Sequence, residues 1–285
     1  MEAEKAPLVW SILDRLAAQR IEPRTTPAFA GWLHAVSGRQ VPWPLLDEEA
    51  LLEQEIDICI GLGGDGTLLD TVVLVGRTNI PVLGINLGRM GFLSSVRLEE
   101  VDHAITQIRN GHYSLQDRTL LEVTNHREKL GHRNFALNEV SVHKRDTSSM
   151  IAVQVHLGAD HLNTYWSDGL IIATPTGSTA YSLSAGGPII YPTSDVLLIN
   201  PISPHNLNVR PFVVPDHYTI TLKLEARSEL CLLNLDSRST PIDGHGKITI
   251  RRAGFTVKLM QLEGQDFLTT LKGKLNWGLD MRSRQ

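Results

Sequence analysis

Residues 56–75, IDICIGLGGDGTLLDTVVLV, determine how the first part of this 285-residue chain folds. Residues 56–62 form a short apolar run of the kind found in a strand that is buried in a parallel sheet. Residues 67–75 are expected to form a helix. The glycine-rich segment 61–67 lies between them, so its backbone N–H groups and the helix N-terminus can face a phosphate at close range. The stretch therefore predicts a strand, a nucleotide-binding loop and a helix.

The flanking sequence extends this α/β pattern over residues 1–112. Apolar residues at helical spacing predict an opening helix over 7–20, with no strand ahead of it. Further helices are expected over 47–55 and 99–110, and a second buried strand over 81–86.

Beyond residue 112 the pattern changes to short β-rich runs. Strands are expected over 120–124, 135–143, 151–157, 170–174, 196–199, 218–224, 230–235 and 247–252. Residues 113–265 are therefore expected to form a β-rich domain, and residues 266–285 to return to the first domain, with a helix over 266–275. The predicted fold class is an α/β N-terminal domain plus an all-β C-terminal domain.

Composition excludes several classes of protein. The 27 basic and 31 acidic residues leave a formal charge of −4, so no basic excess indicates nucleic acid or an anionic membrane as the partner. The longest uncharged stretch, 169–194, contains four Gly and three Pro and is interpreted as buried loops, not as a membrane span. Cys59 and Cys231 have no metal-binding spacing, and the start of the chain lacks a signal peptide, so a cytoplasmic location is expected.

The glycine loop does not fit two common nucleotide-binding motifs. Gly61, Gly63 and Gly66 match GxGxxG, but no acidic residue occurs between residues 71 and 98 to hold a ribose, as a dehydrogenase would require. A Walker loop is excluded because no Lys follows the last glycine. Backbone amides, the helix dipole and Mg²⁺ are expected to neutralise the phosphate charge instead.

Asp65 places a carboxylate inside this loop, where it would repel a passively bound pyrophosphate. One interpretation is that Asp65 caps the helix that follows, an effect worth about 1 kcal/mol. The interpretation we favour is that Asp65 accepts a hydroxyl proton during phosphoryl transfer, a role worth ~10²- to 10⁴-fold in rate.

Three downstream segments carry polar groups suited to a nucleotide. Asn138 and Glu139 offer an amide beside a carboxylate, a pair that fits adenine edges and ribose hydroxyls. Residues 166–169 read WSDG, and residues 174–188 read TPTGSTAYSLSAGGP. Six hydroxyl side chains between residues 174 and 184, with one aromatic ring among them, can surround a nucleobase.

These segments resemble the NAD kinase family. Residues 63–67, GGDGT, look like the signature of a superfamily that also contains lipid kinases and phosphofructokinases. Residues 86–93 are similar to the NAD kinase segment NxGxLGFL, with Met90 in place of the usual Leu. The run over 174–188 closely resembles that family, so an NAD kinase-like two-domain fold is expected.

The resemblance implies transfer of the γ-phosphate of ATP to the 2′-hydroxyl of the adenosine ribose of NAD, with a divalent metal, Mg²⁺ by expectation, and no dedicated protein metal site. It implies that Asp65 is the proton acceptor and that Gly63, Gly64, Gly66 and Thr67 form the phosphate loop. Residues matching family positions that hold NAD are Asp65, Gly66, Asn138, Glu139, Asp168, Thr179, Ala180, Tyr181, Ser182, Leu183 and Ser184, with weaker matches at Ser149, Trp166 and Arg238. Family members commonly form dimers or tetramers.

Besides Met90, the chain departs from the family pattern at two places. Trp166 stands where some bacterial members have Arg, which leaves the preference for NAD or NADH open. The family usually begins with a strand, so a truncated or misassigned start is expected, with an exposed apolar sheet edge that reduces solubility or stability. Two other functions stay open: a lipid or sugar kinase that shares the loop, and a noncatalytic dinucleotide sensor.

Overall fold

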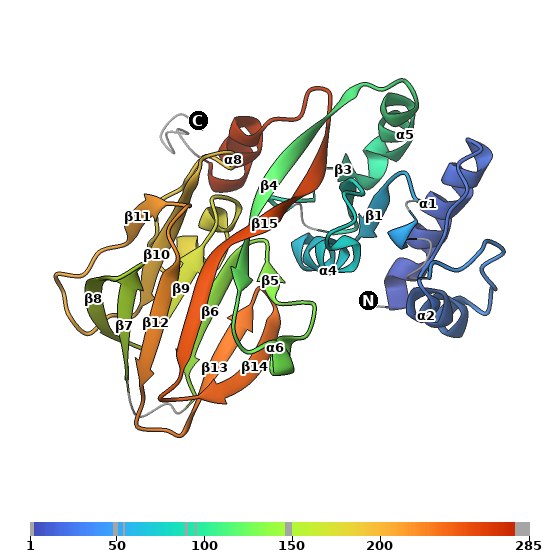
Figure 1. Ribbon diagram of the computed structural model, residues 1–285. Coiled ribbons are helices and arrows are strands. Elements are labelled where there is room, and N and C mark those ends of the chain that lie inside the picture. The colour runs from blue at the N-terminus through green and yellow to red at the C-terminus, as the bar shows by residue number, and fades with distance from the viewer. Residues whose placement is uncertain are drawn as a thin grey trace. The chain divides into compact units, whose positions relative to one another are not determined.

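The computed structural model describes residues 3–47, 51–53, 55–88, 91–94, 96–145 and 150–276 (Figure 1). The chain divides into two compact units. Unit 1 contains Met1–Gln116 and Lys258–Gln285, and unit 2 contains Asp117–Val257. Two long strands, β4 (Tyr113–Val123) and β15 (Lys247–Leu262), have residues in both units.

Unit 1 has a parallel sheet with helices, as an α/β fold requires. Its strands are β1 (Cys59–Leu62), β2 (Val82–Asn86), β3 (Val96–Arg97) and the end of β15. Strand β2 pairs in parallel with β1, β3 and β15, and Cys59 and Leu259 both lie opposite Val82. All five residues of β2 are buried, which confirms the buried strand that residues 81–86 predicted.

The described helices of unit 1 agree with the sequence, apart from α2 (Pro27–Ser37), which was not predicted. They are α1 (Ala6–Ala18), α2, α4 (Asp65–Val75), α5 (Val101–Arg109) and α8 (Phe267–Leu275), with short 3₁₀ turns η1 (Ala3–Lys5) and η2 (Leu98–Glu100). Of the helix expected over 47–55, positions 48–50 and 54 lie outside the described residues.

Helix α2 was not predicted, although its start and end carry ordinary helix signals. Thr26 caps the helix by accepting a hydrogen bond from the Phe29 N–H, and Pro27 occupies the first turn. Gly38 ends the helix in the left-handed conformation at φ 69°. Only Leu33 of this helix is buried, so the helix lacks a strong apolar periodicity.

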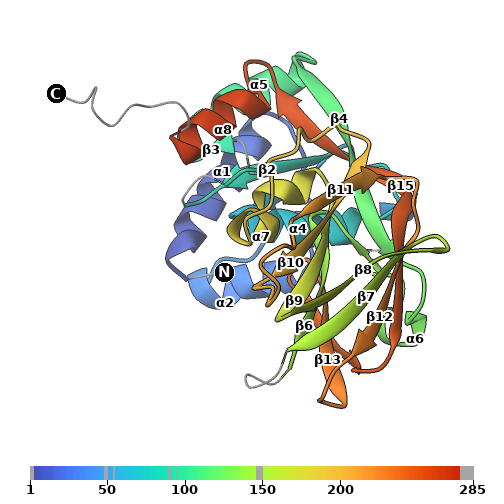
Figure 2. The ribbon, with the colours of Figure 1, turned by 90° about the vertical axis from the view of Figure 1, so that its left-hand side faces the viewer.

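Unit 2 is a sandwich of two antiparallel sheets, which confirms the all-β expectation (Figure 2). The first sheet has the order β11 (Phe212–Pro215), β10 (Val196–Ile202), β9 (Gly169–Ala173), β6 (Glu139–Lys144), β13 (Leu230–Leu235), β14 (Arg238–Asp243). The second sheet runs from β15 through β12 (Ile220–Glu225) and β7 (Ile151–Leu157) to β8 (Asp160–Ser167), with β4 paired to β15 and β5 (Phe135–Ala136) paired to β4. Short helical segments are α6 (Arg127–Leu130), η3 (Thr176–Thr179) and α7 (Tyr181–Ser184).

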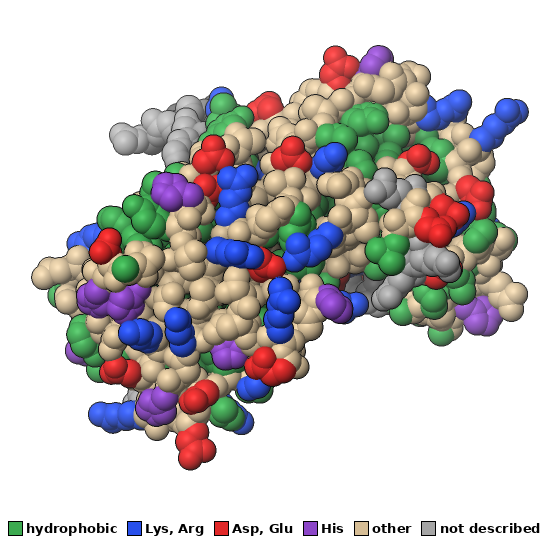
Figure 3. Space-filling view, viewed as in Figure 1, with side chains coloured by type: hydrophobic (Ala, Val, Ile, Leu, Met, Phe, Trp, Pro, Cys, Tyr) green, Lys and Arg blue, Asp and Glu red, His purple; other side chains and the backbone are tan. Residues whose placement is uncertain are grey.

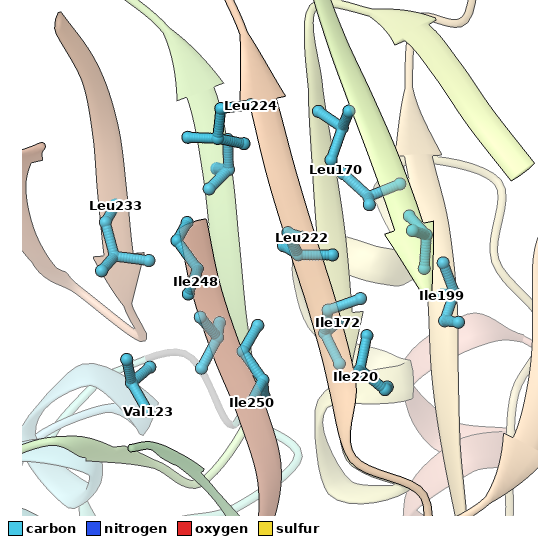
Figure 4. Packing of buried hydrophobic residues seen from close by; sticks show 14 of the residues in the cluster. Val123, Leu170, Ile172, Ile199, Ile220, Leu222, Leu224, Leu233, Ile248 and Ile250 are labelled. Carbon is cyan, nitrogen blue, oxygen red and sulfur yellow. The ribbon is translucent and has the colours of Figure 1, made fainter. Parts of the chain in front are cut away.

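Branched aliphatic side chains fill the space between the two sheets (Figure 4). Ile172 of β9 and Ile199 of β10 come from one sheet, and Leu222 of β12 and Ile250 of β15 come from the other. All four residues have no exposed surface. Burial of such side chains stabilises the unit by roughly 1.5–3 kcal/mol each.

Sequence reasoning missed three strands of unit 2 and set two boundaries wrongly. Strands β8, β11 and β14 were not predicted, and β8 has only Tyr165 and Ser167 buried. Each of the three lies at one end of the strand order of its sheet, so among the described strands it has a partner on one side only, and its apolar pattern is weak. The run predicted over 135–143 is interrupted between β5 and β6, and β15 continues ten residues past the predicted end at residue 252.

Two arginines of β15 form ion pairs with buried carboxylates of unit 2. Arg251 lies 3.0 Å from the buried carboxylate of Glu122, and Arg252 lies 2.6 Å from that of Asp216.

Basic and acidic side chains both occur on the face seen in Figure 3. Within the described ranges, no helix is long and apolar enough to cross a membrane.

We predict that Leu222→Ala destabilises unit 2 by about 2–5 kcal/mol, because it removes buried methyl groups and leaves a cavity in the sandwich. Lys223→Ala is the matched control, because Lys223 follows Leu222 in the same strand and is exposed on the other face of the sheet. The free energy of unfolding of this variant should differ from that of the wild type by less than about 0.5 kcal/mol. Urea unfolding of both variants measures the difference. Equal losses would contradict this packing.

Candidate active site

The glycine loop connects strand β1 to helix α4, as the sequence predicted. Gly63 N–H donates to the Ile85 carbonyl of β2 at 2.9 Å, which ties the loop to the sheet. Helix α4 begins at Asp65 with Gly64 as its N-cap residue, and Gly64 and Gly66 are exposed. The first N–H groups of the helix have no partner within it, and the positive end of the helix dipole lies there. The loop is therefore open to an anion such as a phosphate.

Asp65 does not cap its own helix, because its carboxylate binds a second loop. Oδ2 accepts a hydrogen bond from the Phe92 N–H at 2.7 Å. Oδ1 accepts from the Leu93 N–H at 3.1 Å and from the Ser94 N–H at 3.0 Å. The capping interpretation is therefore not what the structure shows.

The approach of this loop to Asp65 requires glycine at position 91. A Cβ atom on Gly91 would lie only 1.8 Å from Oδ1 of Asp65, so any other residue would displace the carboxylate or the loop. Residues 89 and 90 of the predicted motif lie outside the described residues. Segments 63–67 and 91–94 therefore meet at Asp65.

In unit 2, Asn138 and Glu139 are buried at the start of strand β6. Their backbone is fixed by the β13–β14 turn, where Asp236 accepts hydrogen bonds from the N–H groups of both residues at 2.8 and 3.1 Å. Thr174, at the end of β9, donates its N–H to the Asn138 carbonyl at 2.9 Å. A Cβ on Gly177 would lie 2.1 Å from that carbonyl, so the 174–177 segment approaches as closely as glycine allows.

The side chains of this pair retain unused polar atoms. Asn138 Oδ1 and Glu139 Oε2 are buried and have no hydrogen-bond partner among the described residues. Burial raises the pKa of Glu139 to about 8, and the nearby charge of Asp236 adds to this effect. Glu139 is therefore mostly protonated at neutral pH. Buried polar atoms without partners are costly, which is typical of a site that is completed by a ligand.

Tyr181 lies close to both Glu139 and Asp168. Burial, followed by the charges of these two carboxylates, raises the pKa of the Tyr181 phenol. One face of its ring stacks on His143, with ring centroids 5.7 Å apart and an interplanar angle of 14°. Tyr181 is still 40% exposed, so an aromatic surface remains open to a ligand. Asp168 pairs with Lys144 at 2.5 Å.

The remaining residues of the 174–184 run divide into structural and accessible groups. Ser182 is fully buried and accepts a hydrogen bond from Asn200 Nδ2 at 3.1 Å. Ser178 Oγ donates a hydrogen bond to the Pro175 carbonyl at 2.7 Å, so this hydroxyl stabilises the local backbone. Surface is left on Thr179, Ala180, Tyr181, Leu183 and Ser184.

The three weaker sequence matches have different surroundings. Trp166 lies on β8 and is 48% exposed. The guanidinium of Arg238 donates hydrogen bonds to the carbonyls of Arg133 and Phe135, which stabilises the chain just before Asn138. Ser149 lies outside the described residues.

Sequence reasoning missed several residues that shape the site. Asp236, Lys144 and His143 all contact predicted residues but were not selected from the sequence. Asp236 had a detectable signal, because an Asp between two β-rich runs is typical of a tight turn. Nothing in the sequence shows that this turn faces Asn138, which is 98 residues away.

Comparison with known proteins gives one family. Residues 33–113 match the model of the ATP-NAD kinase N-terminal domain, and residues 137–262 match that of the C-terminal domain. The chain is 39% identical over 279 residues to a Flavobacterium johnsoniae protein named NAD kinase, covering 97% of this chain and 95% of that protein. It is 44% identical over 227 residues to the NAD kinase of Cytophaga hutchinsonii, covering 80% and 78%.

Two solved structures share the fold. Yeast NADH kinase complexed with NADH has a TM-score of 0.83 at 24% identity, with 99% of this chain and 86% of that chain covered. An NAD kinase from Archaeoglobus fulgidus in complex with ATP has a TM-score of 0.72 at 23% identity, with 94% of each chain covered. Both agree with the predicted fold class.

We predict that Glu139 makes the protein less stable as the pH rises. Its carboxyl stays protonated in the folded state up to about pH 8, whereas the unfolded chain releases the proton near pH 4.3. The free energy of unfolding should therefore fall between these values by at most about 1.4 kcal/mol per pH unit from this group. Glu139→Gln removes that contribution.

Urea unfolding at pH 5, 6, 7 and 8 measures the effect. The stability of Glu139→Gln relative to the wild type should rise steadily with pH. Glu225→Gln, at an exposed position of β12, is the control and should follow the wild type. Parallel curves for the wild type and Glu139→Gln would show that Glu139 is ionised throughout.

Proposed function

The chain belongs to the NAD kinase family, and on that premise we propose that Asp65 accepts the proton when phosphate passes from ATP to NAD. The chain is thus a phosphotransferase that makes NADP, which differs from NAD by a phosphate on the 2′-hydroxyl of the adenosine ribose. Matches to both domain models identify this family instead of the lipid and sugar kinases. The presence of Asp65 argues against a noncatalytic sensor.

The three backbone hydrogen bonds to Asp65 carry the proposal. A carboxylate has about four acceptor positions, and Phe92, Leu93 and Ser94 fill three of them. Oδ1 accepts two of these bonds and Oδ2 accepts one, counting the described residues. Oδ2 is therefore the atom we assign to the substrate hydroxyl. The amides also fix the direction in which the remaining acceptor position points.

The proton balance of the reaction gives Asp65 a defined task. The 2′-oxygen forms a bond to the γ-phosphorus, the bond from that phosphorus to the bridging oxygen of ADP breaks, and the hydroxyl proton leaves. We assign that proton to Oδ2 of Asp65. The N–H groups at the start of α4 and the exposed glycines Gly64 and Gly66 are suited to the phosphates, with Gly63 and Thr67 shaping the loop.

We assign NAD recognition to the polar cluster of unit 2. The unpartnered oxygens of Asn138 and Glu139 can bond ribose hydroxyls or an adenine amine. The open face of Tyr181 is suited to stacking on a base, and Asp168 lies close enough to affect its pKa. Further candidates for NAD contacts are Gly66, Ser149, Trp166, Thr179, Ala180, Ser182, Leu183, Ser184 and Arg238.

Divalent metal use follows from the reaction with ATP, and we propose Mg²⁺. The ion usually keeps several waters and binds substrate phosphates. The remaining acceptor position on Oδ2 of Asp65 is assigned to the substrate hydroxyl, so we expect the phosphates of ATP, which we assign to the glycine loop, to hold the ion. Bound there, Mg²⁺ would neutralise charge on the phosphate oxygens. Among the described residues, no three Asp, Glu, His or Cys side chains form a metal-binding group.

We also propose a homo-oligomer of two or four chains and a cytoplasmic location. Family resemblance supports the oligomer. The thiols of Cys59 and Cys231, which are free and buried, fit a reducing compartment.

We predict that Asp65→Asn lowers kcat by at least ~10²-fold, because an amide cannot accept the proton. NAD affinity should stay close to that of the wild type. The measurement is ATP- and Mg²⁺-dependent formation of NADP, read with an NADP-specific dehydrogenase, together with calorimetric NAD titration. A near-wild-type rate would remove the assignment of Asp65.

A second pair of variants separates loss of the base from loss of its position. Gly91→Ala keeps the carboxylate but inserts a methyl group 1.8 Å from its Oδ1, so it should also lower kcat. Gly31→Ala, at a position with no atom within 4 Å of the added methyl, is the control and should retain full activity. If Gly91→Ala is fully active, the amide bonds to Asp65 do not matter for the reaction.

We further predict that Tyr181→Ala weakens NAD binding about tenfold, since stacking of a base on an aromatic ring is worth about 1–3 kcal/mol. Asp168→Ala should also weaken it. Tyr218→Ala removes an exposed tyrosine that stacks on His217 and serves as the control. Calorimetric titration with NAD measures all three. Unchanged affinity in Tyr181→Ala and Asp168→Ala would exclude this cluster as the NAD site.

A further inference from the structure

Asp236 occupies a strained position at the β13–β14 turn. It adopts the left-handed conformation at φ 52°, which favours glycine over residues with a side chain. The residue is half-buried, and its carboxylate faces three consecutive N–H groups of Leu137, Asn138 and Glu139 at 2.9, 2.8 and 3.1 Å. Its own N–H donates to the Glu139 carbonyl at 2.9 Å. A glycine would close the same turn at lower conformational cost, so the carboxylate has another use.

The same turn holds the preceding residues through Arg238. Its guanidinium donates to the carbonyls of Arg133 and Phe135, while Asp236 accepts from the N–H groups that follow. Arg238 also opposes the rise in the pKa of Asp236 that burial causes. One turn therefore binds both the donors and the acceptors of the segment 133–139.

The other side of that segment is held by strand β9 and the residues after it. Thr174 Oγ1 donates to the Leu137 carbonyl at 2.6 Å, and Thr174 N–H donates to the Asn138 carbonyl. The backbone of Asn138 is thus bonded through its N–H to Asp236 and through its carbonyl to Thr174. Asn138 Oδ1 and Glu139 Oε2, by contrast, have no hydrogen-bond partner among the described residues.

We propose that Asp236 is a positioning residue, which orients the side chains of Asn138 and Glu139 toward NAD by fixing their backbone. The proposal rests on the function assigned above to these two residues. Because Asp236 accepts three bonds, its loss frees three successive N–H groups and lets the segment rotate. The negative charge of Asp236 also opposes ionisation of Glu139.

Asp236→Asn tests the proposal, because it preserves shape but loses the charge and one acceptor. We expect kcat/KM for NAD to fall at least about tenfold, mainly through KM, since hydrogen bonds to charged groups are stronger than neutral ones. Asp216→Asn is the matched control, a buried aspartate of the same unit that pairs with Arg252. It should leave KM for NAD unchanged even if it lowers the melting temperature. Equal KM values in Asp236→Asn and the wild type would overturn the proposal.

The pH profile provides a readout that general destabilisation would not move. The groups that act on Glu139 are Asp236, Arg238 through Asp236, and the Tyr181 phenol. Removing the charge of Asp236 should move the Glu139 step in the pH profile of kcat/KM for NAD to lower pH. Glu139→Gln should lack that step, and its loss would assign the step to the Glu139 carboxyl. A step that stays at the same pH in Asp236→Asn would contradict the charge coupling.

A double-mutant cycle distinguishes this proposal from the assignment of the NAD site. If Asp236 acts through Glu139, Asp236→Asn should have a smaller effect on KM in the Glu139→Gln background than alone. Fully additive effects would overturn the positioning role. If Glu139→Gln and Asn138→Ala both leave NAD affinity unchanged, the site assignment fails instead. Asp236→Gly, which relieves the left-handed backbone while deleting the carboxylate, replaces the Asn variant if that variant does not fold.

Discussion

Hydrogen bonds from three consecutive backbone N–H groups to one carboxylate hold a segment of the candidate site in each unit. Asp65 binds residues 92–94 in unit 1, and Asp236 binds residues 137–139 in unit 2. In each case the carboxylate lies at a sharp change of direction, at the start of α4 or in the β13–β14 turn. Charge-assisted bonds of this kind are about twice as strong as neutral ones, so each rigidly connects two segments that are distant in sequence.

Local patterns were sufficient to predict the framework that carries these carboxylates. The β1–loop–α4 unit was predicted from the apolar run 56–62, the glycines after it and a helical run. These signals for burial and for backbone freedom come from residues that are neighbours in the sequence. Helix α2 and strand β8 were missed because each buries only one or two residues, and their apolar periodicity is correspondingly weak. Whether a strand lies at the edge or in the middle of a sheet depends on the tertiary structure, and the sequence of that strand alone does not determine it.

The candidate site divides in the same way between local and long-range information. Residue type and motif indicated Asp65, Asn138 and Glu139, and the structure gives each of them a constrained backbone or carboxylate. What the sequence could not show is the partner of each. Asp65 bonds residues 27 to 29 positions away, and Asp236 bonds residues 97 to 99 positions away. Such pairings arise only when the sheets assemble.

Charge compensation makes the acid-rich cluster that we propose as the NAD site compatible with an anionic dinucleotide. Lys144 neutralises Asp168, and Arg238 lies near enough to Asp236 to oppose the rise in its pKa that burial causes. Glu139 has no cationic partner in the described part of the chain, but it is mostly protonated near pH 7 because its pKa is about 8. Asp168, Asp236 and Glu139 thus contribute little net negative charge, although all three are acidic residues. A pyrophosphate would meet hydrogen-bonding groups there without strong repulsion, and full ionisation of Glu139 at higher pH would add one uncompensated charge to the cluster.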